Sequence, residues 1–386
     1  MPTAYVDVKP DIIRWLLTQT TEEQLGKAIM DNIYLWLDGS KKPTFNQVKE
    51  VSKKSNIPLG YFFLNKPPKD SPKIIEYRTV DSRQMHSPTR NLIDTIYEME
   101  AVQDWMIRYR RNNGFDKVQV VGSMRSNIEV QAVVDAIRTD LELDVNWYEQ
   151  LANSVASFSY IRNLLEEHGI IVMQNGIVGK NTHRPLDPIE FKGFTITNPW
   201  APLIFINSAD THNSKIFTLL HEIAHVWIGE DDLYNDSYDN KTNHKKLEQI
   251  CNAVAGEVLV PTERFIIKWA EIKARDEVSK IQSLAKYFNC SEYVIARRAL
   301  DLDKIGHASY NEIVNRIAQI YSQSKVTKKS SGGDYYNTMR SRLDKNFATA
   351  LYESVQRGDT TYTEAYRLTN TNRITFEKVM SKVGGI

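Results

Sequence analysis

Two histidines and a glutamate stand together in the run His221-Glu222-Ile223-Ala224-His225. Side chains four residues apart project from the same face of an α-helix, so both imidazoles could reach one metal ion. Glu222 lies on the adjoining edge of that face, where its carboxylate could take a proton from a water molecule at the ion. The alternative is a buried helix whose two histidines have ordinary hydrogen-bond partners.

A metal site of this kind needs a third ligand, because catalytic zinc usually has three protein ligands and one open position. Residues 247–259 carry apolar side chains at the spacing of a second buried helix, and Pro261 ends it. Its carboxylates are Glu248 and Glu257. We expect Glu248 to face the histidines, because it neighbours the apolar stripe and an isolated carboxylate facing a core is costly unless it binds a partner or a metal. A surface glutamate at a helix start is the alternative.

Three separate blocks of the sequence agree in order and spacing with one known family. They are residues 201–207, 217–225 and 248–261. Together they resemble the ImmA/IrrE family of metallo-endopeptidases, strongly over about residues 155–300 and more loosely over the whole chain. The overall organisation is similar to longer members that carry an N-terminal XRE-type helix-turn-helix segment.

The resemblance implies roles for four residues. His221, His225 and Glu248 would bind Zn²⁺, and Glu222 would be the catalytic general base. Characterised proteases of the family cut a repressor protein and so switch on genes of a mobile element or a stress regulon. The protein substrate implied here is therefore a helix-turn-helix repressor or another regulatory protein.

Composition fits an enzyme that works inside the cell. The 386 residues include 49 basic and 48 acidic ones, so the net charge of +1 gives no overall attraction to nucleic acid. The two cysteines, Cys251 and Cys290, are too few for a disulfide framework. The N-terminus lacks the hydrophobic region of a signal peptide, and no apolar run approaches membrane-spanning length. We expect a cytoplasmic protein with no membrane partner.

The pattern of elements predicts an α+β protein that is mostly helical. From the pattern we expect a helical domain over 1–70, a helical connecting region over 71–149, helices with a small sheet over 150–300, and a C-terminal helical region over 301–386. The resemblance implies that the first is XRE-like and that the third is a zincin-like metallopeptidase domain. Two helices are expected in that last region, over 336–357 and 362–370.

The N-terminal domain gives weak evidence for DNA binding. The stretch that would be its recognition helix, residues 29–40, has no Lys or Arg and contains Asp31 and Asp38, whose charges would repel phosphates. Docking to a repressor or to a second copy of the chain is favoured. Residues 282–300 also have a helix-turn-helix pattern with Arg297 and Arg298, but a two-helix brace on the peptidase explains the same pattern and is favoured.

Short buried strands are expected at 169–173, 191–196 and 203–206, beside the two motif helices. A strand edge near the metal would suit an extended peptide substrate. In the polar stretch 229–246, an oxyanion-stabilising group could be Tyr234, Tyr238 or His244, although surface placement is the simpler interpretation for each.

The sequence therefore predicts a zinc-dependent endopeptidase. A rival hypothesis is an antitoxin-like or repressor-like DNA-binding regulator whose peptidase module is inert or only senses zinc. In a third hypothesis, the N-terminal domain holds the helix-turn-helix of a repressor substrate.

Overall fold

The computed structural model describes residues 4–68, 76–77, 88–229, 241–327 and 334–384. It is a mostly helical α+β structure, as predicted. The chain divides into two compact units, Met1–Lys73 with Gln84–Tyr97, and Ile74–Arg83 with Glu98–Ile386. The finer four-part division stays a prediction.

The first unit is helical throughout its described part. Its elements are α1 (Pro10–Gln19), α2 (Glu22–Leu25), α3 (Lys27–Leu37), α4 (Phe45–Ser55) and the 3-10 helix η1 (Leu59–Phe63). Thr44 begins α4 with a capping box, in which its hydroxyl accepts from the Gln47 amide and the Gln47 side chain accepts from the Thr44 amide. Ile12, Ile33 and Val48 are fully buried, which gives this unit a small core of its own.

The second unit contains a four-stranded sheet in the order β1-β3-β4-β2. Its strands are β1 (Glu76–Tyr77), β2 (Ile171–Asn175), β3 (Gly193–Ile196) and β4 (Leu203–Asn207). β2 and β4 are parallel, whereas β3 is antiparallel to both of its neighbours. β1 pairs with β3 opposite Thr195 and Phe194, so this edge of β3 is not open along these residues.

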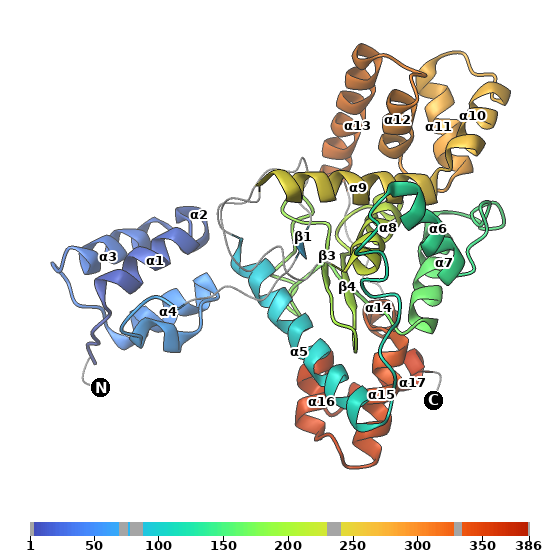
Figure 1. The fold of residues 1–386 in the computed structure, drawn as a ribbon. Coiled ribbons are helices and arrows are strands. Elements are labelled where there is room, and N and C mark those ends of the chain that lie inside the picture. The colour runs from blue at the N-terminus through green and yellow to red at the C-terminus, as the bar shows by residue number, and fades with distance from the viewer. Residues whose placement is uncertain (1–3, 69–75, 78–87, 230–240, 328–333, 385–386) are drawn as a thin grey trace. The chain divides into compact units, whose positions relative to one another are not determined.

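Helices cover the sheet in layers (Figure 1). α8 (His212–Ile228) packs on β3 and β4, and α9 (Lys241–Leu259) packs along α8. α6 (Val130–Asp140) and α7 (Ser154–Glu167) complete this layer. Farther from the sheet lie α10 (Thr262–Glu271), α11 (Glu277–Tyr287), α12 (Glu292–Asp301) and α13 (His307–Thr327). One core cluster joins β2 and β4 with the helices α6 to α13, so apolar contacts hold the two motif helices between the sheet and the outer helices.

The C-terminal region contains more helices than predicted. The helix expected over 336–357 is two helices, α14 (Tyr335–Arg342) and α15 (Lys345–Gln356). The break falls at Asp344, whose Oδ1 accepts from the Phe347 amide as an N-cap while Oδ2 accepts from the Val172 amide on β2. α16 (Tyr362–Thr369) was expected, but α17 (Phe376–Gly384) was not.

The C-terminal helices pack against α5 (Arg90–Asn112), whose second half belongs to this unit. The Trp105 ring meets the Phe347 ring edge-on with centroids 5.6 Å apart, and its Nε1 donates to Thr360 at 3.1 Å. Arg108 forms an ion pair with Glu364 at 3.3 Å. Residues more than 240 positions apart in sequence therefore hold these two parts of the chain together.

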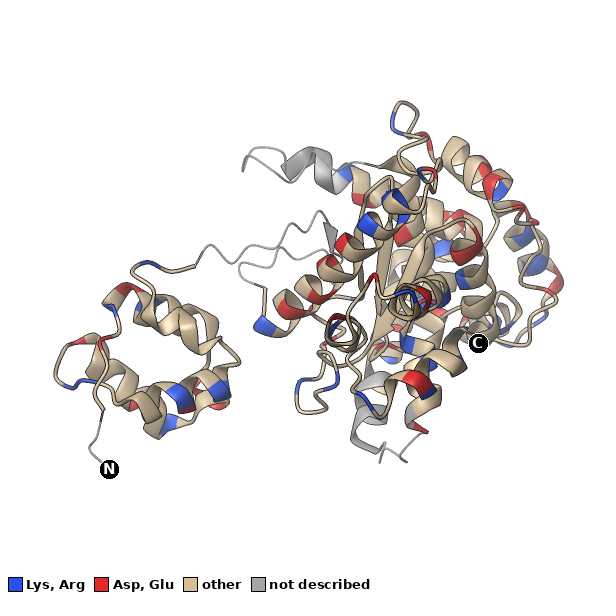
Figure 2. Ribbon diagram, turned by 90° about the horizontal axis from the view of Figure 1, so that it is seen from below, with Lys and Arg blue, Asp and Glu red and all other residues tan. Residues whose placement is uncertain are grey.

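Basic and acidic residues are interspersed along the helices of both units (Figure 2). Within the part of the chain that the structure describes, no helix has both the length and the apolar character that crossing a membrane requires.

Candidate metal centre

α8 places both motif histidines in the core. It begins at Thr211, whose hydroxyl accepts from the Ser214 amide at 3.2 Å, and ends at Gly229, which adopts the left-handed conformation (φ 62°) of a C-cap. His221 is 1 % exposed and His225 is 3 % exposed. Their Nε2 atoms lie 3.0 Å apart, so the spacing of four residues brings the two imidazoles to one point as predicted.

α9 brings the predicted third residue to the same point. Glu248 Oε2 lies 3.3 Å from His221 Nε2, and Oε1 lies 3.5 Å from His225 Nε2. Ligand atoms of the three residues all lie within 4.8 Å of one another. Burial alone would raise the pKa of the Glu248 carboxyl, but hydrogen bonding and the charges of the two histidines outweigh it and hold this pKa well below its usual value.

The other carboxylate of this helix lies elsewhere. Glu257 forms an ion pair with Arg298 of α12 at 2.5 Å and accepts from both the amide and the hydroxyl of Thr262. These contacts tie the end of α9 to α10 and α12. The structure therefore separates the two candidate ligands, since Glu248 faces the histidines and Glu257 has a structural ion pair.

The three side chains fit a zinc ion. A tetrahedral ion with bonds of 2.0–2.2 Å holds its ligand atoms about 3.4 Å apart, and the separations here are 3.0, 3.3 and 3.5 Å. The Glu248 side chain is 16 % exposed and its two carboxylate oxygens face the two imidazoles, and a largely buried carboxylate is costly unless a positive charge lies beside it. Two imidazole nitrogens and one carboxylate are also a donor set that zinc accepts.

The far side of each imidazole has a polar neighbour on α9. Asn252 Oδ1 lies 3.2 Å from His221 Nδ1, and Cys251 Sγ lies 3.4 Å from His225 Nδ1. A proton on each Nδ1 leaves the Nε2 lone pair directed at the common point, and such outer contacts fix the orientation of metal-binding histidines. Nothing in the sequence pattern identified this contact for either residue, although both follow Glu248 within about one helical turn.

Glu222 is 1 % exposed and contacts the sheet. Its Oε2 accepts a hydrogen bond of 2.9 Å from the Thr195 hydroxyl of β3. Nothing in the sequence pattern identified Thr195. Of the candidates for oxyanion stabilisation, Tyr234, Tyr238 and the His244 side chain lie outside the described residues.

Comparison with known proteins agrees with this architecture. Residues 165–300 match the model of the IrrE N-terminal-like domain, peptidase M78, a range that contains α8, α9 and all four predicted site residues. Over this range the chain is similar to the IrrE N-terminal-like domain, which agrees with its resemblance to the ImmA/IrrE family. The XRE-like assignment of the N-terminal helices stays a prediction.

Two proteins similar to part of this chain are called radiation response metalloprotease IrrE. The protein from Deinococcus radiodurans is 37 % identical over 101 residues, which cover 22 % of this chain and 31 % of that protein. The protein from Deinococcus deserti is 31 % identical over 103 residues, which cover 23 % and 36 %. The chain thus spans about a third of the length of these relatives. Residues 343–382 match a domain of unknown function, DUF8813. No solved structure matches the chain.

Proposed function

We propose that this chain is a zinc-dependent endopeptidase that cleaves a repressor or another regulatory protein. The observation that carries the proposal is the convergence of His221, His225 and Glu248, with Glu222 beside them on the same helix as the histidines. The name metalloprotease given to the two IrrE relatives supports the same reaction class. Cleavage of such a substrate would derepress genes of a mobile element or a stress response.

The four side chains divide the work between binding and proton transfer. His221, His225 and Glu248 would hold Zn²⁺, which when bound supplies Lewis acidity toward water and toward the scissile carbonyl. Glu222 would take a proton from the attacking water on its carboxylate and deliver it to the nitrogen of the leaving amine. His221, Glu222 and His225 are buried and Glu248 is 16 % exposed, and this low exposure to water strengthens their electrostatic interactions.

The metal assignment is tested by exchanging each carboxylate of α9 in turn. We expect the full chain to bind one equivalent of zinc, Glu248→Gln to lose most of it, and the matched variant Glu257→Gln to keep it. Metal analysis of the dialysed proteins makes this comparison. Retention by Glu248→Gln together with loss by Glu257→Gln would overturn the ligand set.

The reaction can be tested before the substrate has been identified. Zinc-loaded wild-type chain and Glu222→Gln are each incubated with lysate of the producing cells, and newly formed protein N-termini are labelled and sequenced. We expect new N-termini in a regulatory protein with the wild type alone. If the wild type forms none, or if Glu222→Gln forms the same ones, the proposal fails.

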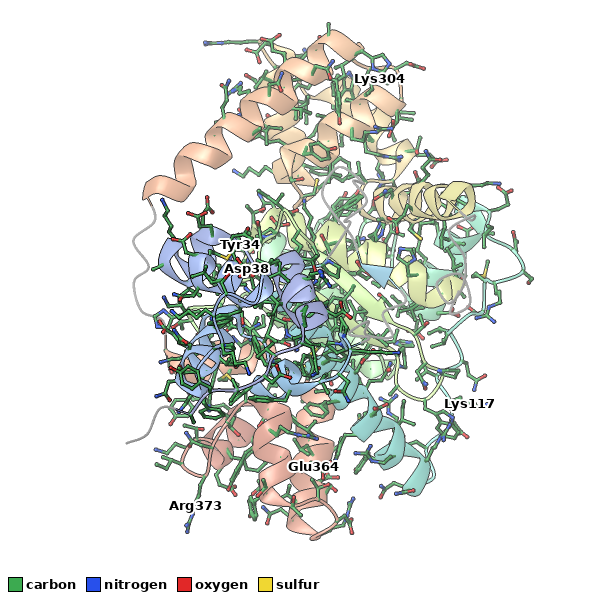
Figure 3. All side chains as sticks on the ribbon, turned by 90° about the vertical axis from the view of Figure 1, so that its left-hand side faces the viewer. Tyr34, Asp38, Lys117, Lys304, Glu364 and Arg373 are labelled. Atoms are coloured by element: carbon green, nitrogen blue, oxygen red, sulfur yellow. The ribbon has the colours of Figure 1, made fainter. Side chains whose placement is uncertain are left out.

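The helix order of the first unit is the one observation that favours the rival function, a DNA-binding regulator. Against it, the exposed side of α3 carries Tyr34 (53 % exposed), Leu35 (40 %) and Asp31, with Asp38 just beyond the end of the helix (Figure 3). Hydrogen bonds from the side chain and amide of Ser40 lower the pKa of Asp38, so this carboxyl is anionic at neutral pH. An apolar and acidic surface suits a protein partner better than a phosphate backbone.

Fluorescence anisotropy with labelled DNA from upstream of the gene separates the two functions. We expect the full chain to bind this DNA no more tightly than a scrambled duplex. Tight, salt-dependent binding to the upstream sequence alone would support the rival.

A further inference from the structure

We propose that Thr195 is a positioning residue for Glu222, which it holds against the sheet in the orientation that proton transfer needs. This inference rests on the proposed function, because it assigns a support to the general base of that reaction. Thr195 is 1 % exposed and lies within β3, whereas Glu222 belongs to α8, 27 residues later in the chain. Its Oγ1 donates to Glu222 Oε2 at 2.9 Å.

The same face of β3 also limits where the second carboxylate oxygen can lie. Gly193 is two residues before Thr195, so both positions face α8. A Cβ at Gly193 would lie 3.1 Å from Glu222 Oε1, 2.8 Å from Thr218 Cγ2 and 3.0 Å from the Phe205 carbonyl oxygen. Glycine at 193 therefore makes the room that the Glu222 carboxylate occupies, and the hydroxyl at 195 fixes its rotation.

A fixed carboxylate matters for the reaction because glutamate has three rotatable side-chain bonds, and proton transfer requires hydrogen-bond distance to the reacting atoms. In the buried site, a hydrogen bond to the ionised carboxylate is also stronger than one between neutral groups. Loss of the hydroxyl should slow the chemical step and leave the metal ligands and substrate contacts in place.

The test compares Thr195→Val, which has nearly the same shape but no hydroxyl, with Thr195→Ser, which keeps the hydroxyl. The control is Thr197→Val, since Thr197 is also buried and its Oγ1 has no hydrogen-bond partner among the described residues. The substrate is a synthetic peptide that spans the cleavage site found by N-terminal sequencing. All variants are studied as the full chain loaded with zinc.

We expect Thr195→Val to lower kcat roughly 10- to 100-fold with KM and zinc content unchanged. Thr195→Ser should recover kcat to within about threefold, because the hydrogen bond remains. Thr197→Val should behave as the wild type. An unchanged kcat in Thr195→Val, or a Thr195→Ser variant as slow as Thr195→Val, would overturn the proposal.

A second readout does not depend on activity. Thermal unfolding of the metal-free chain is measured for Thr195→Val, Glu222→Met and the double variant. We expect the effect of Thr195→Val on Tm to shrink when Glu222 is already replaced, whereas Thr197→Val should add independently of Glu222→Met. Additive effects of Thr195→Val and Glu222→Met would mean that the two residues are not coupled. If the wild type cleaves nothing, the proposed function fails, and this cycle still reports whether Thr195 holds Glu222.

Discussion

A buried pair of carboxyls predicts that the second unit loses stability as the pH rises. Glu166 on α7 accepts from Arg162 Nε at 2.8 Å, and Asp344 at the start of α15 lies fully buried beside them. Burial, and next the charge of Asp344, raise the pKa of Glu166 to about 7 despite Arg162, and burial also raises the pKa of Asp344. The charge of Arg162 does not offset the burial of the two carboxyls, so the folded protein keeps a proton on the pair near neutral pH.

The sign and size of the effect follow from linkage. The pKa of Glu166 is higher in the folded protein, about 7, than its ordinary value of 4.5. The folded state therefore binds the proton more tightly, and this stability is present below pH 4.5 and is lost as the pH rises through 7. A span of roughly 2.5 pH units at 1.36 kcal/mol each gives about 3 kcal/mol.

Hydrogen exchange of peptides from β2 and α15 measures this loss of stability locally, because Asp344 accepts hydrogen bonds from the amides of Val172 in β2 and Phe347 in α15. We expect their free energy of opening to fall by up to about 3 kcal/mol between pH 5 and pH 8 in the wild type. Glu166→Gln should reduce the fall, because glutamine does not titrate. The exposed variant Glu353→Gln on α15 should keep the wild-type fall. A Glu166→Gln variant with the full wild-type pH dependence, or a wild type that gains stability with pH, would refute the reasoning.

Further predictions concern the two motif helices and the break before α15. Asn252→Ala should weaken zinc binding roughly 10- to 100-fold, because the His221 ring loses a contact that orients it. The control Gln249→Ala, on the same helix, should bind zinc as the wild type does. Equal zinc affinities of the two variants in a competition titration would argue against a role for the Asn252 contact. Gly229→Ala should destabilise the chain by about 2–5 kcal/mol, because its φ is 62° and a Cβ would overlap Gly122 Cα. Gly39 also has a positive φ, but a Cβ there would meet open space, so Gly39→Ala should lower the free energy of unfolding by only about 1 kcal/mol. Similar losses for the two variants in urea unfolding would show that the Gly122 contact has no effect. Asp344→Ala should lower the free energy of unfolding by about 2–5 kcal/mol in the same assay, since it removes an N-cap and leaves the buried Val172 amide without its acceptor. A loss below about 1 kcal/mol would contradict that role.

The parts of the site that local periodicity controls could be predicted from the sequence. His221 and His225 lie together because any α-helix places residues four apart on one face. The apolar stripe of 247–259 was enough to predict that Glu248 faces the histidines. The strands at 171–175, 193–196 and 203–207 lie within two residues of the predicted ranges. These features depend on short sequence windows, in which the hydrophobic pattern is informative.

The break between α14 and α15 shows where such windows fail. The stretch around Leu343 and Asp344 has no proline or glycine, and its spacing is compatible with one continuous helix. A continuous helix does not form because the Asp344 carboxylate accepts two hydrogen bonds. One comes from the Phe347 amide, which makes Asp344 the N-cap of α15, and the other comes from the Val172 amide, more than 170 residues earlier in the chain. Tertiary contacts of this range override local helix propensity.

The role of Thr195 could not be predicted from the sequence for a related reason. A half-buried strand reveals its inward face by alternating polar and apolar residues, but all four residues of β3 are buried, so the alternation is absent. A threonine in a fully buried strand must satisfy its hydroxyl, yet the pattern does not tell on which side of the sheet the partner lies. Only the packing of α8 on β3 shows that the partner is Glu222, and a polar residue inside an otherwise apolar strand next to a motif helix is the signal that could have directed attention there.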